Sequence, residues 1–75
     1  MPFEITFKQR KVGRRIDVLH DGRIVVQVVP DEKYPGMYRV LADGQLSDMV
    51  NLTRATDAAR LSAQTILNRN GLAAE

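Results

Sequence analysis

The segment from Ile24 to Val29 constrains the fold of this chain more than any other. Five of its six residues are Ile or Val, and branching at Cβ restricts χ1 in a way that favours an extended backbone. Asp21-Gly22 precedes it, and an Asp-Gly pair between two apolar runs is the strongest short-range signal for a β-hairpin. Pro30 follows it, and proline donates no hydrogen bond to a neighbouring strand. The sequence therefore predicts a strand over 24–29 that pairs with the run before the turn.

Four further strands are predicted from alternating apolar and polar residues. They cover residues 3–8, 15–19, 37–42 and 45–50. Asp43-Gly44 repeats the hairpin signal between the last two of them. We therefore expect two hairpins and an N-terminal strand, all antiparallel.

A helix is predicted over 54–68. Thr53 or Thr56 can cap its first turn, and Asp57 then lies near the positive end of the helix dipole. One side of this helix carries mostly small residues, which allow a close approach to the sheet: Ala55, Ala58, Ala59, Ser62 and Ile66. The predicted fold class is therefore α+β, with an antiparallel sheet of three to five strands and one C-terminal helix packed on one face.

Length and composition limit what such a domain can do. A chain of 75 residues buries only about 60% of the surface that it exposes when unfolded. We expect a single domain over 1–75, with 71–75 as a frayed tail after Gly71. The chain has no cysteine, which excludes a disulfide framework and a thiolate zinc site. No apolar stretch approaches the roughly 20 residues of a membrane span, and the alternating N-terminal residues do not resemble a signal peptide. A cytoplasmic protein is expected.

The residues that carry enzyme chemistry are sparse. His20 is the only histidine, and it stands beside the Asp21-Gly22 turn, where we expect it to be exposed. The acidic residues are scattered over turns and strand edges, whereas general acid–base catalysis needs carboxylates that share a partly dry cleft. No glycine-rich phosphate loop is present. We therefore predict a protein that is not an enzyme, with no catalytic residue, metal, cofactor or small-molecule substrate.

Positive charge is concentrated near the N-terminus. The net charge is +2, yet five of the eight residues from Lys8 to Arg15 are basic and none is acidic. One interpretation is a solvated strand end whose charges prevent pairing with other chains. The other is a surface that binds the phosphates of a nucleic acid. In the second case the contacting residues are expected to be Lys8, Arg10, Lys11, Arg14, Arg15 and Arg39.

A second apolar surface is predicted on the sheet face that the helix does not cover. Strand alternation turns one set of apolar residues away from Val26, Val28, Tyr38 and Val40, and a single helix can cover only one face. The members of this set are Val25, Val29, Met37, Leu41 and Met49, with Leu19 nearby. A homodimer or a protein partner would bury them, unless the first strand or the tail folds across them. The first hypothesis is therefore a binding module for protein–protein contact or self-association, and the alternative is nucleic-acid binding.

Two resemblances bear on these hypotheses. Three antiparallel strands followed by an alanine-lined helix that opens with Thr56-Asp57-Ala58-Ala59 resemble, over residues 14–68, the plant ethylene-response-type DNA-binding domain. They also resemble the amino-terminal arm-binding domain of phage and transposon tyrosine integrases. The resemblance implies a sheet that enters the major groove, here through Arg15, Gln27 and Arg39. This chain differs from both groups in having no Trp and several apolar residues on that face.

The second resemblance is carried by two tracts, residues 34–40 and residues 46–53. They look like segments of small uncharacterised alpha-proteobacterial proteins. This resemblance implies a bacterial origin and no particular activity.

Overall fold

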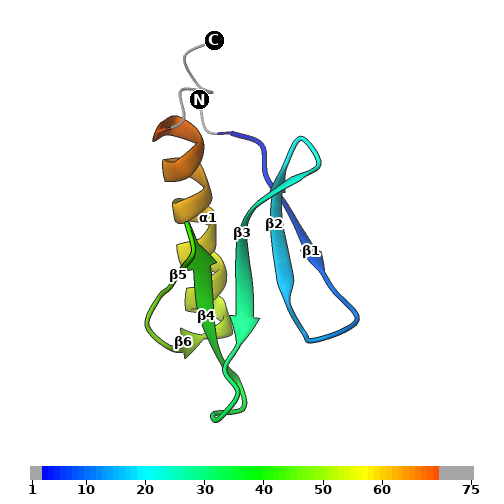
Figure 1. Ribbon diagram of the computed structural model, residues 1–75, viewed down its shortest axis with the longest axis vertical. Helices are drawn as coiled ribbons and strands as arrows, with labels where there is room; N and C mark the ends of the chain where they lie inside the picture. Colours follow the sequence, from blue (N-terminus) through cyan, green and yellow to red (C-terminus); the bar gives the residue numbers. More distant parts are fainter. Residues whose placement is uncertain (1–2, 70–75) are drawn as a thin grey trace.

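The computed structural model describes residues 3–69 as one sheet and one helix. The strands are β1 (Thr6–Gln9), β2 (Ile16–His20), β3 (Arg23–Pro30), β4 (Met37–Ala42), β5 (Gln45–Leu46) and β6 (Val50–Asn51), and the helix is α1 (Leu52–Arg69). All strand pairs are antiparallel, in the order β1-β2-β3-β4-β5, and β6 also pairs with β4. Helix α1 packs on one face of the sheet, mainly over β3 and β4 (Figure 1). The predicted fold class is confirmed, while the expected tail 71–75 lies outside the described residues.

Two tight turns close the hairpins β2–β3 and β4–β5. Asp21-Gly22 and Asp43-Gly44 each join two strands directly. In both turns the Asp and the Gly have positive φ, between 52° and 76°. A two-residue loop with positive φ at both positions is the type I′ turn, whose twist matches that of the flanking strands. Both hairpin predictions are confirmed.

The returning strand predicted over 45–50 is divided into β5 and β6. The pairing register on β4 changes by one residue between them. At the break, the Ser47 backbone N–H donates to the Val40 carbonyl at 2.9 Å, and the Ser47 hydroxyl accepts from the Val40 backbone N–H, also at 2.9 Å. The serine side chain thus supplies an acceptor that a continuous strand would supply from its backbone.

A β-bulge in β3 redirects one of the predicted interface residues. Val18 pairs with Val26, but the next residue, Leu19, pairs with Ile24, so Val25 is the extra residue of β3. Such a residue bends the strand and changes the direction of its side chains. Val25 packs against the core on the helix side. The prediction that it lies on the opposite face is therefore wrong.

Helix α1 begins two residues earlier than predicted because Asn51 caps it. The Asn51 Oδ1 accepts a hydrogen bond from the Arg54 backbone N–H at 2.8 Å, which satisfies one of the unpaired donors of the first turn. The predicted caps, Thr53 and Thr56, are wrong, since the Thr56 hydroxyl donates to the Thr53 carbonyl instead. Asparagine is as good a cap as threonine, so the cap residue could not be chosen from residue type alone.

The core lies between the small-residue side of α1 and the β-branched residues of the central strands. Ala55 and Ala59 are fully buried, as predicted, and Ala63 and Leu67 extend the buried side by two further turns. Opposite them lie the valines of β2, β3 and β4, which are also buried: Val18, Val26, Val28 and Val40. Alanine at each turn lets the helix approach the sheet closely, because a methyl group is the whole side chain.

The N-terminal segment packs on the same side of the sheet as the helix. Ile5 and Phe7 contact the core, and the Arg60 guanidinium lies 5.0 Å from the centre of the Phe7 ring. His20 Nδ1 donates to the Glu4 carbonyl at 2.8 Å, so His20 is held against this segment and is not the exposed turn residue that we expected. The alternative in which the first strand folds across the other face is also wrong.

Candidate functional site

The face of β1–β5 opposite α1 is called the open face here. Side chains alternate between the two faces along β2 and β3, and the neighbours of Asp17 and Gln27 point toward the helix. Asp17 and Gln27 therefore belong to the open face. The pairing registers then join residues from five strands into one row across this face: Lys8, Asp17, Gln27, Leu41 and Leu46.

A second row crosses the open face at the end where β3 finishes. The Arg10 backbone N–H donates to the Arg15 carbonyl at 2.8 Å, which continues the β1–β2 pairing. Val29 pairs with Arg39 on β4. Arg15, Val29 and Arg39 also line a single concavity, into which Leu41 and Leu46 of the first row project. Charged and apolar side chains therefore share one shallow surface.

Asp17 organises the basic half of this surface. Its Oδ1 accepts from the Gln27 side-chain amide at 2.8 Å and its Oδ2 accepts from Arg10 Nε at 2.7 Å. The residue is buried, at 4% exposure, although it belongs to the open face. The hydrogen bond from Gln27 holds the pKa of Asp17 below its ordinary value, and the hydrogen bond and charge of Arg10 and the charge of Lys8 act in the same direction against the cost of burial. Asp17 is therefore ionised at neutral pH and fixes Arg10.

Asp31 fixes Arg39 in a similar way. Its Oδ2 accepts from the backbone N–H groups of Lys33 and Tyr34, each at 3.0 Å, and its Oδ1 accepts from Arg39 Nε at 3.1 Å. The Arg39 Nη1 group donates to the Ser47 carbonyl at 3.0 Å. The hydrogen bond from Arg39 lowers the pKa of Asp31, and the Tyr34 and Lys33 backbone donors add to this effect. The loop after β3 and the break after β5 thus hold Arg39 from two sides.

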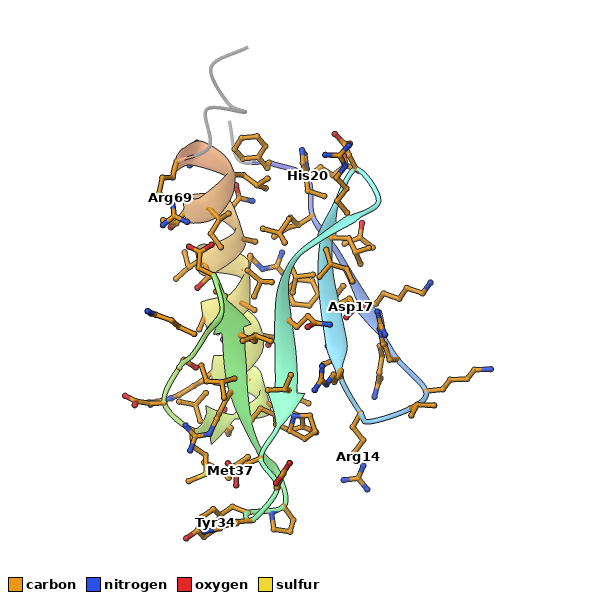
Figure 2. The ribbon with its side chains drawn as sticks, in the orientation of Figure 1. Arg14, Asp17, His20, Tyr34, Met37 and Arg69 are labelled. Carbon is orange, nitrogen blue, oxygen red and sulfur yellow. The ribbon has the colours of Figure 1, made fainter. Side chains whose placement is uncertain are left out.

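The predicted basic residues divide into two groups. Lys8, Arg10, Arg15 and Arg39 belong to the open face through their places in the two rows. Lys11 and Arg14 lie in the connection between β1 and β2, and Arg14 points away from the sheet at its end (Figure 2).

The predicted apolar residues are only partly brought together. Val29, Met37 and Leu41 alternate onto the open face and are half-buried. Met49 lies between β5 and β6, where strand alternation is interrupted. Val25 has turned to the helix side, where it lines a separate concavity with Ile66 and Leu67.

Leu46 is an apolar member of the open face that the sequence prediction missed. It pairs with Leu41 and is 57% exposed. The two-residue turn at Asp43-Gly44 fixes this pairing, so counting outward from the turn could have found it.

Features typical of other sites are few in the described part of the chain. Residues 3–69 hold no group of three or more His, Asp or Glu side chains that could bind a metal ion. Within the same residues, α1 is the one long helix, and it is not apolar enough to cross a membrane. No family model matches the chain, and no curated protein or solved structure shows a significant similarity to it.

Proposed function

We propose that this domain is a non-enzymatic binding module that docks another protein on its open face. The observation that carries the proposal is the exposed Leu46, which stands beside the half-buried Leu41 and shares a concavity with Val29. Exposed apolar side chains that cluster, with charged groups at their margin, are typical of interaction surfaces.

The fold supports this proposal because its helix and its N-terminal segment leave the open face uncovered. The helix and the N-terminal segment both pack on the other side. Fully burying an exposed Leu or Val side chain is worth roughly 1.5–3 kcal/mol, and completing the burial of a half-buried one is worth less. A partner that covers these residues would therefore gain free energy from their burial. A protein partner supplies the matching apolar surface.

Nucleic-acid binding is the second candidate, and one observation favours it. Three guanidinium groups, those of Arg10, Arg15 and Arg39, lie in a single row, with Lys8 in the next row. Each phosphate that such groups neutralise contributes about −0.9 to the slope of log affinity against log salt concentration. Four contacts would therefore give a slope of about −3.6.

The mass of the domain in solution, measured by light scattering after gel filtration, tests two partners, a second copy of the chain and duplex DNA. We expect the mass of one chain from micromolar to millimolar concentration, with and without duplex DNA. If the domain self-associates and Leu46→Lys abolishes this association, the partner is a second copy of the chain. A mass increase with DNA would favour the second candidate.

The matched control is Leu61→Lys, since Leu61 is 69% exposed on the helix and the substitution is the same. If Leu61→Lys abolished self-association and Leu46→Lys left it intact, the helix would be the docking surface. That result would contradict the proposed function.

A further inference from the structure

We infer that the protein docked on the open face presents a short segment that combines acidic and apolar side chains. The inference rests on the proposed function and names the chemistry of its partner. It follows from four features of the open face: its charge, the way its arginines are held, its size, and the mixture of residues in its concavity.

The charge of the open face is positive. Four basic residues belong to its two rows, namely Lys8, Arg10, Arg15 and Arg39, and they face two carboxylates, Asp17 and Asp31. Glu32 and Lys33, which line the same concavity, offset each other. Complementary potential guides association and excludes partners of the same sign. The partner segment should therefore be negative.

Hydrogen bonds hold two of the arginines in positions from which they can bind an anion. Arg10 uses Nε to bind Asp17, and Arg39 uses Nε to bind Asp31 and Nη1 to bind the Ser47 carbonyl. Within residues 3–69, no hydrogen bond engages the terminal nitrogens of Arg10 or the Nη2 group of Arg39, so these donors can bind a ligand. Side chains that are already fixed lose less entropy on binding, and the planar guanidinium matches a carboxylate. Asp17 and Asp31 thus act as positioning residues.

The size of the open face suits a segment better than a second folded surface. Five strands about 4.8 Å apart span roughly 19 Å, and a five-residue strand such as β2 is about 17 Å long. The flat area is therefore roughly 320 Å², well below the 800 Å² or so that each partner buries in a standard interface. In a homodimer through this face, the two positively charged surfaces would also repel each other, because a two-fold interface joins identical surfaces.

The residues of the concavity favour a protein segment over nucleic acid. Val29, Leu41 and Leu46 stand among Arg15 and Arg39 in it. A phosphate backbone offers no apolar surface to these side chains, and protein–nucleic acid interfaces are more polar than protein–protein interfaces. A segment that carries Asp or Glu beside Leu, Ile, Val or Phe can pair its carboxylates with the arginines and pack its apolar side chains against the leucines and the valine.

Selection from a library of random peptides tests the inference without knowledge of the natural partner. The immobilised wild-type domain should enrich peptides with a net negative charge and at least two large apolar residues. Binding of each enriched peptide is then measured on three variants, Leu46→Ser, Arg15→Ala and Leu61→Ser, after circular dichroism has shown that each is folded. Arg15→Ala removes one charge-assisted hydrogen bond and Leu46→Ser removes the apolar contact, so each should weaken binding about tenfold, whereas Leu61→Ser should leave it unchanged.

Four results would overturn the inference, and they differ in what they say of the proposed function. Enriched peptides that depend on Leu46 but carry no acidic residues would overturn the inference and leave the proposed function in place. Peptides that bind Leu46→Ser as well as the wild type, or no enrichment at all, would overturn both. A short DNA duplex that displaces the acidic peptides at lower concentration than an unlabelled copy of the peptide would make nucleic acid the better ligand.

Discussion

The side-chain amide of Gln64 makes two hydrogen bonds with the backbone of Phe3, both 2.7 Å long. Its Oε1 accepts from the Phe3 N–H and its Nε2 donates to the Phe3 carbonyl. This pair joins the N-terminal segment to the C-terminal half of α1, and the Phe3 ring lies edge-on to His20 with 5.2 Å between ring centres. The segment is thereby held on the helix side, and the open face stays uncovered by the described chain.

Replacing Gln64 with Ala should release this segment. Two hydrogen bonds are lost, each worth about 0.5–1.5 kcal/mol, so the free energy of unfolding should fall by roughly 1–3 kcal/mol. Hydrogen exchange should also become faster at the Phe3 amide. Thr65→Ala is the control, because Thr65 is exposed on the same helix. Equal stability of the two variants would show that the Gln64 bonds contribute nothing.

Acid should destabilise the domain through Asp17 and Asp31. The pKa of each is lower in the folded chain than its ordinary value of 3.8. A lowered folded-state pKa gives stability that is fully present above the unfolded pKa and is lost as the pH falls through the folded pKa. The free energy of unfolding should therefore decline from about pH 5 downward, and the decline should be smaller in the double variant Asp17→Asn, Asp31→Asn.

Chemical denaturation at a series of pH values measures this decline. Asp57→Asn is the control, since Asp57 is exposed on α1 and is not one of the ion-paired acids in residues 3–69. An unchanged dependence on pH in the double variant would mean that the Arg10 and Arg39 pairs do not form in solution.

Enlarging Ala59 should destabilise the core. Ala59 is fully buried at the centre of the helix–sheet contact, and extra methylene groups in a packed core typically cost 1–3 kcal/mol, so Ala59→Leu should lower the free energy of unfolding by about that amount. Leu61→Ala, on the exposed side of α1, should change it by less than about 0.5 kcal/mol. Thermal unfolding of both variants gives the comparison. If Ala59→Leu were as stable as the wild type, the helix would pack through another face.

Much of the fold could be predicted from the sequence because local signals agreed with one another. Both Asp-Gly turns, the strand before Pro30 and the burial of Ala59 follow from turn chemistry and periodicity. The bulge at Val25 and the break at Ser47 could not, because each depends on how a strand fits its neighbour. The cap at Asn51 depends on where β6 ends and on the chain direction there.

The candidate site was less predictable for the same reason. Four of the six predicted basic residues belong to one face, but the sequence could not show that Asp17 and Asp31 would hold two of them. Those contacts join residues seven or more positions apart in the chain, across strands or from a loop to a strand. Alternation also misassigned Val25 because a single extra residue reverses the face of a side chain.

Site-specific photo-cross-linking in cells that express this protein tests the role of the open face most directly. Replacing Leu46 in one variant and Leu61 in another with p-benzoyl-phenylalanine puts the same reactive group on two exposed positions on opposite sides of the domain. We predict that irradiation joins a second, different polypeptide to the domain from position 46 and not from position 61. An adduct that forms equally from both positions, or only from position 61, would contradict the assignment of the open face as the docking surface.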